Sequence, residues 1–335
     1  MIMIGQETRE VERKILTILR ILSQSNEPMG SRVISKLLEQ KGISLGERAV
    51  RYHLKTMDER GLTRSIGRKD GRIITPSGLQ ELKDGLVTDK LGFINSRIEY
   101  LAYQTNFGLR SASGRVPIDL SGFERNDLPR AIKMMKPIFA TGICSSNLVT
   151  LVSEGTKVGD LVIPPGKIGL ITLCDTVIAG CFLKGGIPVY PRFGGLLQFK
   201  SGQPFRFVDL IEFAGTSINP PDIFIAAKMT SVSNVAAEGH GKVLATYYEI
   251  PSFSAVKAEA MLQHLKNNKF VNSAYLASPG ETTFEIYVGQ DRAGLVTLSG
   301  MNPAAAAAEG GIELSRYPMC SMLEVNRLSL FADLI

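Results

Sequence analysis

The chain has 335 residues, of which 44% are hydrophobic, so it is long enough for two or three packed domains and is neither fibrous nor disordered in composition. Its first residues, MIMIGQETREVERK, lack the apolar stretch of a signal peptide, and no run reaches the roughly 18 apolar residues of a membrane span. The four cysteines show no C-x-x-C spacing and the three histidines lie far from them in the sequence. We therefore expect a cytoplasmic protein with reduced thiols and no metal site.

The net charge of +6 is concentrated in the first quarter of the chain. Residues 1–90 hold 17 Lys and Arg against 12 Asp and Glu, whereas residues 91–335 hold 21 against 20, so the two parts carry +5 and +1. A small basic region joined to a nearly neutral large region predicts a polyanion-binding domain coupled to a domain with another task.

Three amphipathic helices are predicted before residue 61 from apolar residues recurring every three or four positions. The third spans about Gly46 to Arg60, and its apolar face can close a helical core. The opposite face carries three cations and a phenol that we expect to enter a DNA groove; these residues are Arg48, Arg51, Tyr52 and Lys55.

The segment TRSIGRKDGRIITPSG then predicts two short strands joined by a basic turn, followed by a further helix. Three helices and a basic hairpin predict a winged helix-turn-helix over residues 1–85, with duplex DNA as the partner. Arg68, Lys69 and Arg72 of the wing are expected to contact flanking phosphates. A solvated basic surface is the alternative, but it explains the order of elements and the hairpin less well.

A connecting helix is predicted within residues 86–114. Its sequence LGFINSRIEYLAYQTNFGL, the following SGRVPIDLSGF, and KGGIPVYPRFGGLLQF further along resemble the archaeal nitrogen-regulatory repressor family NrpR over essentially the whole chain. The resemblance implies a homodimer that represses nitrogen-assimilation genes and is released from its operator, expected to be palindromic, by the dicarboxylate 2-oxoglutarate. Longer relatives carry two effector domains in series. This chain carries one, so a separately encoded effector subunit is a further expected partner.

Residues 115–335 are predicted to form an α+β effector domain with an internal duplication, so the fold class of the whole chain is α+β. Gly169–Ile187 aligns without gaps with Gly294–Ile312 at an offset of 125 residues, with eight of 19 positions identical. Each copy reads as an apolar strand, a small-residue segment, a Gly-Gly turn and another strand, which places the repeat halves at about 115–225 and 226–335. Chance similarity between small-residue segments is the alternative.

Two segments are candidates for binding an anionic effector. In the first, the planar guanidinium of Arg192 lies beside Gly194 and Gly195, whose missing side chains would admit a ligand, although a β-bulge also explains the glycines. The second segment is expected to begin a helix whose first N–H groups face a carboxylate, an ordinary helix cap being the alternative. Its residues are Cys144, Ser145, Ser146 and Asn147.

The motifs of common enzyme classes are absent from the sequence: there is no Gly-x-Ser-x-Gly, no phosphate-binding Gly-x4-Gly-Lys-Ser/Thr and no His-Glu-x-x-His. We therefore predict a repressor that is not an enzyme and needs no cofactor. Two alternatives stay open at this point. One is a metabolic enzyme acting on a small acid with an appended DNA-binding domain, and the other is a constitutive architectural DNA binder.

Overall fold

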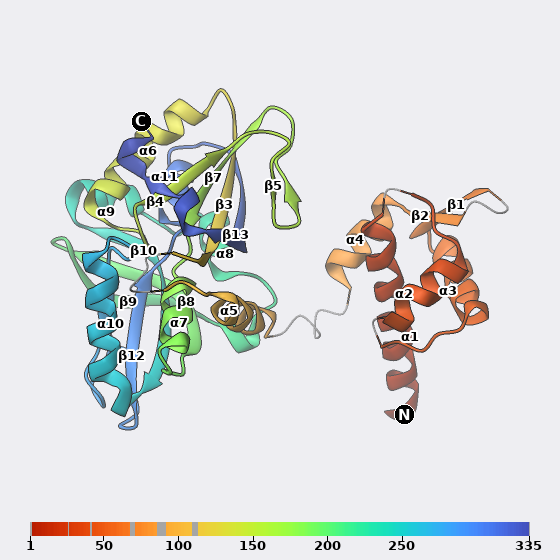
Figure 1. The fold of residues 1–335 in the computed structure, drawn as a ribbon, viewed down its shortest axis with the longest axis horizontal. Coiled ribbons are helices and arrows are strands. Elements are labelled where there is room, and N and C mark those ends of the chain that lie inside the picture. The colour runs from red at the N-terminus through yellow and green to blue at the C-terminus, as the bar shows by residue number, and fades with distance from the viewer. Residues whose placement is uncertain are drawn as a thin grey trace. The chain divides into compact units, whose positions relative to one another are not determined.

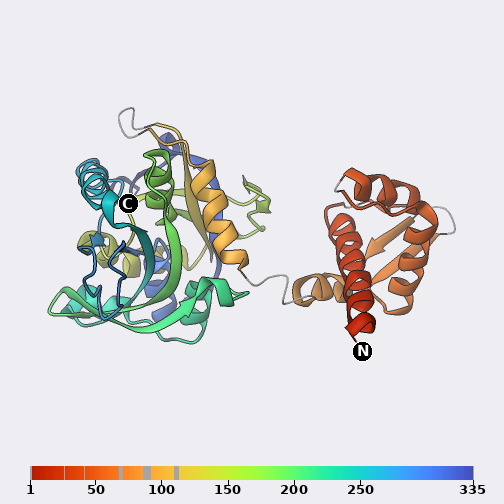
Figure 2. The same cartoon turned by 90° about the horizontal axis from the view of Figure 1, so that it is seen from below.

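The computed structural model describes residues 2–25, 27–40, 42–67, 71–85, 92–108 and 113–334, with side chains except for those of 2–10 and 83. The chain divides into two compact units, Met1–Lys90 and Leu91–Ile335 (Figures 1 and 2). Within the described ranges, no helix combines the length and the apolar character that crossing a membrane requires.

The first unit is a winged helix, as predicted. Its elements in chain order are α1 (Ile2–Ser23), α2 (Ser31–Gln40), α3 (Glu47–Glu59), β1 (Thr63–Gly67), β2 (Gly71–Ile74) and α4 (Pro76–Asp84). The strands β1 and β2 pair antiparallel, and Met29 forms a bridge to Arg72 beside them. Apolar residues of α1, α2 and α3 are buried in one cluster, because each helix turns its apolar face inward.

The second unit contains two five-stranded antiparallel sheets. The first sheet has the order β13 (Leu314–Glu324), β3 (Arg115–Glu124), β7 (Lys167–Leu173), β4 (Leu148–Val152) and β14 (Ser329–Leu330). The second has the order β11 (Ala274–Leu276), β12 (Arg292–Leu298), β10 (Gly241–Pro251), β8 (Tyr190–Lys200) and β9 (Gln203–Glu212). A small hairpin of β5 (Lys157–Val158) and β6 (Leu161–Val162) stands apart from both.

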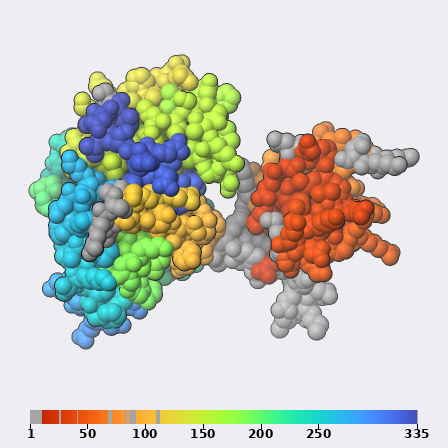
Figure 3. Space-filling view, in the orientation of Figure 1, coloured from red at the N-terminus to blue at the C-terminus, as the bar shows by residue number. Residues whose placement is uncertain are grey.

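Helices gather around two apolar cores in this unit (Figure 1). One core includes α6 (Leu128–Thr141), α11 (Asn302–Glu309) and α9 (Val232–Glu238), with α8 (Pro220–Ala226) nearby. The other includes α5 (Phe93–Gln104), α7 (Thr176–Lys184) and α10 (Ala255–Asn267). Figure 3 shows α5 at the surface, beside α7 in green and the C-terminal segment in dark blue.

The internal duplication is visible in the fold. Shifting β7, Lys167–Leu173, by the 125 residues found in the sequence gives Arg292–Leu298, the bounds of β12. The following small-residue segments form α7 and α11, and the next strands are β8 and β13. Two similar antiparallel sheets in an α+β chain with an N-terminal winged helix confirm the predicted fold class.

The strands that follow α7 and α11 join the sheet of the other copy. Strand β8 pairs with β10, and β13 pairs with β3, so each sheet contains strands from both copies. Two reciprocal contacts mark this seam: the Thr172 hydroxyl donates to the Gly300 carbonyl at 3.0 Å, and the Thr297 hydroxyl donates to Asp175 at 2.7 Å. Thr172 and Thr297 are 125 residues apart, as are Asp175 and Gly300, so the two contacts join corresponding positions of the two copies, one with a backbone carbonyl and the other with a carboxylate as acceptor.

Replacing Thr172 by valine tests how much the hydrogen bond at the seam contributes to the stability of the fold. The variant Thr172→Val keeps the shape of the side chain but leaves the Gly300 carbonyl without its donor, and an unsatisfied buried carbonyl costs about 1–3 kcal/mol. We expect the free energy of unfolding, measured with urea on the full chain, to fall by that amount. Thr150→Val on β4, which is half-buried, serves as the matched control and should change it far less. Equal losses in the two variants would contradict a special role for the seam.

Candidate functional site

Helix α3 presents the predicted reading face. Val50, Leu54 and Met57 are completely buried in the core of the first unit, and the Gly46 backbone is extended before the helix begins. The four predicted reading residues are all exposed on the opposite side, including Tyr52 at 69%; they are Arg48, Arg51, Tyr52 and Lys55. The helix is therefore fixed by one face and available to a partner on the other.

Two of the cations on this face make ion pairs one helical turn away. Arg51 lies 2.6 Å from Glu47, and Lys55 lies 3.8 Å from Glu59. Exposed pairs of this spacing contribute only about 0.3–0.5 kcal/mol, so a phosphate or a base edge can displace the carboxylates at little cost.

Helix α2 adds two exposed cations that were not predicted from the sequence. Arg32 and Lys36 are four residues apart, on the side away from the buried Ile34 and Leu38. In helix-turn-helix domains the helix before the reading helix crosses the DNA backbone. The helical spacing of Arg32 and Lys36 was the signal that could have found them.

The wing residue Arg72 is engaged within the protein. Its Nε donates to Asp58 Oδ2 at 2.7 Å, and the same carboxylate accepts the Thr63 hydroxyl at 2.6 Å. The Arg72 side chain is only 23% exposed, so it fastens the base of the wing to α3. The other predicted wing contacts, Arg68 and Lys69, lie outside the described residues.

Arg192, the predicted effector-binding arginine, lies on β8 with its side chain 45% exposed. Its Nε is 3.8 Å from Glu249 Oε1, and its guanidinium lies 5.8 Å from the centre of the Phe193 ring. A carboxylate ligand at Arg192 would therefore have to share it with the carboxylate of Glu249.

The prediction that Gly194 and Gly195 leave room for a ligand was wrong, because other parts of the protein occupy the space beside them. A Cβ atom at Gly194 would lie 2.7 Å from Pro220, and one at Gly195 would lie 2.6 Å from the backbone oxygen of Asp209. The glycines allow close packing within the sheet and against α8.

The expected helix after Cys144 was also wrong, since residues 142–147 form a loop that leads into the strand β4. The polar groups of this loop are used across the fold: the Ser145 hydroxyl donates to the Leu173 carbonyl, and the Ser146 hydroxyl donates to the Lys269 carbonyl at 3.3 Å. Burial raises the pKa of the Cys144 thiol to about 12, so it is an inert thiol at neutral pH.

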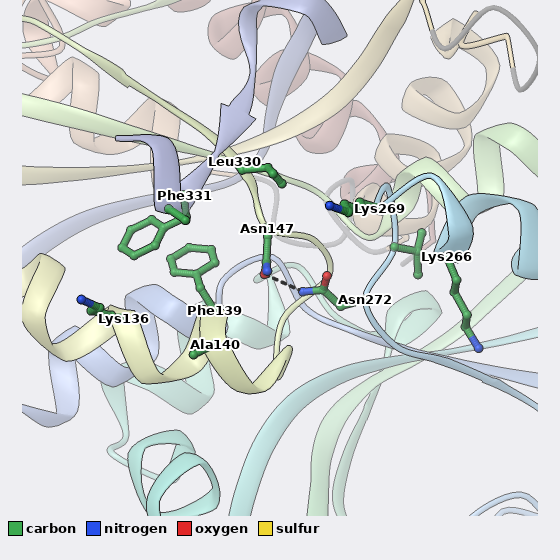
Figure 4. Close-up of a pocket in the computed structure, with 11 residues that line it drawn as sticks. Lys136, Phe139, Ala140, Asn147, Lys266, Lys269, Asn272, Leu330 and Phe331 are labelled. Atoms are coloured by element: carbon green, nitrogen blue, oxygen red, sulfur yellow. Dashed lines mark hydrogen bonds between the residues drawn. The ribbon is translucent and has the colours of Figure 1, made fainter. Parts of the chain in front are cut away.

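The same loop nevertheless lines a pocket of about 490 Å³, here called the lysine pocket (Figure 4). Its wall combines three lysines, two asparagines and apolar groups: Lys136, Lys266, Lys269, Asn147, Asn272, Phe139, Ala140, Val271, Leu330, Phe331 and Ala332. In Figure 4 the two phenylalanines lie on one side of the asparagine pair, and Lys266 and Lys269 lie on the other. The wall as described thus carries cations and amides without an acidic side chain.

The hydrogen bonds of the lysine pocket hold its polar groups in place. Asn272 donates from Nδ2 to Asn147 Oδ1 at 2.9 Å, and its backbone N–H donates to the Ser145 carbonyl at 2.8 Å. Lys266 Nζ donates to the Ala274 carbonyl at 2.9 Å. The rings of Phe139 and Phe331 stack with centroids 4.0 Å apart. Lys269 has a φ of +62°, the left-handed conformation that ends α10, where the Phe270 N–H donates to the Leu265 carbonyl at 3.0 Å.

A winged helix with an exposed basic reading face, joined to a duplicated α+β domain with a cationic pocket, defines a two-part DNA-binding regulator. Comparison with known families gives the more particular class. The family description "NrpR regulatory domains NRD1 and 2" matches residues 91–329, and "Ribonuclease R winged-helix domain" matches residues 16–82. The chain belongs to the NrpR family, which confirms the resemblance found in the sequence.

Three curated relatives agree with this assignment. The global nitrogen regulator NrpRI of Methanosarcina mazei is 36% identical, over 95% of this chain and 98% of its own length. The global nitrogen regulators NrpR of Methanocaldococcus jannaschii and Methanococcus maripaludis are 29% and 30% identical, over 95% and 88% of this chain. The chain spans about half the length of these two, 55% and 51%. All three are named as regulators rather than enzymes, in line with the prediction.

A solved structure shares the fold. The crystal structure of a nitrogen repressor-like protein from Methanococcus jannaschii superposes with a TM-score of 0.59 at 23% identity, covering 70% of this chain and 97% of that one.

The clamp between Arg72 and Asp58 gives a testable prediction for the wing. In a double-mutant cycle of Arg72→Ala and Asp58→Ala, we expect a coupling free energy of about 1 kcal/mol in urea unfolding, as for a hydrogen bond to a charged group that is partly exposed. The matched control is the pair Arg64→Ala and Asp58→Ala, since Arg64 is exposed on the same hairpin. A coupling with Arg64 as large as that with Arg72 would show that general charge, and not this contact, is responsible.

Proposed function

We propose that this protein represses nitrogen-assimilation genes by binding their operators as a homodimer, and that a small dicarboxylate, 2-oxoglutarate, releases it. The observation that carries the DNA-binding part is the exposed basic face of α3, opposite a fully buried apolar face. In this proposal Arg48, Arg51 and Tyr52 would read bases, while Arg32 and Lys36 would contact phosphates.

The lysine pocket is the site that best supports a dicarboxylate effector. Its volume of about 490 Å³ is within the usual range for small-ligand pockets, and its cations and amides suit two carboxylates separated by a short apolar chain. Asn147, proposed from the sequence, contributes to this wall, and Cys144, Ser145 and Ser146 support the loop behind it. Arg192 is the second candidate for binding the dicarboxylate, but its ion pair with Glu249 makes it less suitable than the lysine pocket.

General features of DNA reading support the proposed dimer. One winged helix buries a modest area, whereas two readers held at one helical turn match a palindromic operator and raise each other's effective concentration. The two relatives about twice as long as this chain support a further proposal, that a separate effector-domain subunit completes the regulator.

Base reading and phosphate contact predict different mutant behaviour. Arg51→Ala should cost about 1–3 kcal/mol on a duplex selected by the full chain from a random library, and far less on a scrambled duplex. Lys36→Ala should weaken both duplexes alike and lower the slope of log K against log salt by about one. Titrations at several salt concentrations measure both effects. If Arg51→Ala also lowered affinity equally on both duplexes, base reading by α3 would be excluded.

Effector release predicts a loss of 2-oxoglutarate binding in Lys269→Met. Methionine keeps a long side chain on the same backbone but removes the charge, so affinity for 2-oxoglutarate should fall about tenfold or more, while DNA affinity without effector stays unchanged. Lys257→Met, an exposed position of α10 outside the pocket, is the matched control. Because the coupling is reciprocal, selected DNA must weaken 2-oxoglutarate binding by the same factor that 2-oxoglutarate weakens DNA binding.

Isothermal titration and DNA binding on the same preparations decide between the lysine pocket and Arg192 as the effector site. Normal binding in Lys269→Met together with weakened binding in Arg192→Lys would move the site to β8.

A further inference from the structure

Two buried carboxyl groups occur in one copy of the duplicated domain and not in the other. Asp119 pairs with Thr172 across β3 and β7, and Thr246 pairs with Thr297 across β10 and β12. Because Thr172 and Thr297 are equivalent, Thr246 is the counterpart of Asp119, and Gly300 is the counterpart of Asp175. The duplicated scaffold therefore accommodates a neutral residue at each of these positions, so the architecture by itself does not require an acid there.

Asp119 and Asp175 line one small pocket, here called the carboxylate pocket, with Thr246, Tyr248, Ile98 and Met319 among its other residues. Asp175 Oδ2 accepts the hydroxyl of Thr297 at 2.7 Å and that of Tyr248 at 3.4 Å. Burial raises the pKa of Asp175, and the hydroxyl groups of Thr297 and Thr246 oppose that shift. A hydroxyl group that donates to a carboxylate can still accept a hydrogen bond with its oxygen lone pairs.

Asp119 is only partly satisfied by the protein. Its Oδ1 accepts the Met319 N–H at 2.7 Å, while its Oδ2 has no hydrogen-bond partner among the described residues although the side chain is 1% exposed. Burial raises the pKa of Asp119 to about 7; the Met319 N–H and the Cys174 thiol oppose that shift, and the neighbouring acids Asp175 and Asp222 add to it. Asp222 has its own counter-ion in Arg316, at 3.5 Å. The carboxyl groups of this cluster without a counter-ion among the described residues are thus those of Asp119 and Asp175.

We propose that the carboxylate pocket binds one small monovalent cation close to a water molecule in size, ammonium or potassium. The cavity measures about 20 Å³, which suits a single water-sized occupant. Its donors are carboxylate and hydroxyl oxygens, which bind hard cations. Magnesium demands near-octahedral geometry and usually keeps several waters, for which this pocket has no room. Ammonium would donate hydrogen bonds to Asp119 Oδ2 and to the lone pairs of Thr246 and Tyr248.

The occupant would lie directly beneath α5. Ile98 of α5 lines the carboxylate pocket, and Arg97 donates from Nε to the Met319 carbonyl at 2.9 Å and from Nη2 to the Cys320 carbonyl at 2.7 Å. Met319, whose N–H holds Asp119, has a φ of +51° in an irregular stretch of β13. A cation here would favour one packing of α5, the helix that follows the DNA reader in the chain. This last consequence rests on the proposed function, whereas the binding itself does not.

Thermal unfolding of the full chain without DNA or 2-oxoglutarate tests the binding. Ammonium, potassium, sodium and choline chlorides are compared at one ionic strength, and a ligand that binds the folded state raises the midpoint as its concentration grows. We expect ammonium or potassium to raise the midpoint above that in choline, and the ion with the larger effect identifies the occupant. Coinciding midpoints in all four salts would overturn the proposal. A midpoint that changes with pH alone would overturn it in favour of a bound proton.

A variant in which a residue of the carboxylate pocket is replaced by its counterpart in the second repeat tests whether the cation binds at this pocket. Asp119→Thr introduces the residue found at Thr246 and should abolish the cation response, whereas Asp209→Thr, the same change on β9 outside the pocket, should preserve it. If Asp119→Thr does not fold, Tyr248→Phe removes one oxygen with little change of packing and should reduce the response at least severalfold. A full response in the folded pocket variants would exclude this site. Because DNA takes no part, the result is independent of whether the chain proves to be a repressor.

Discussion

The exchange of strands between the two copies is the constraint on which the rest of the second unit depends. With β8 in the sheet of the second copy and β13 in the sheet of the first, neither copy can complete its hydrogen-bonded ladder alone. The contacts of Thr172 and Thr297 then fix how the two copies meet. A shift at this seam would disturb both sheets together, because packed cores change between discrete arrangements and do not deform continuously.

Both pockets lie where the copies meet. The lysine pocket takes residues from the equivalent junctions of α6 with β4 and of α10 with β11, and the carboxylate pocket takes Asp119 and Asp175 from one copy and Thr246 from the other. If the two copies change their relative arrangement, a ligand that contacts both copies also changes its contacts. Such a difference in affinity is the physical requirement for a ligand to shift a conformational equilibrium.

Local periodicity was sufficient to predict the winged helix, α5 and the duplicated strands, because each depends on neighbours a few residues apart. The loop at residues 142–147 was misread since its serines and asparagine resemble helix caps, while their partners Leu173, Lys269 and Asn272 are distant in the sequence. The glycines of β8 were misread because Pro220 and Asp209 approach them from other elements. Asp119 and Asp175 looked like ordinary polar residues, and only the register of the strands brings them together.

The strand exchange also bears on how the protein is made. Synthesis runs from the N-terminus and domains fold as they emerge, so the reader is complete after about a quarter of the chain. The first sheet, in contrast, cannot close until β13, near the end of the chain, has left the ribosome. During the interval the nascent polypeptide carries a folded winged helix next to an incomplete second unit in which β3 has no partner on one side. An interrupted translation product would thus expose an unpaired strand edge to other chains, and such edges promote aggregation.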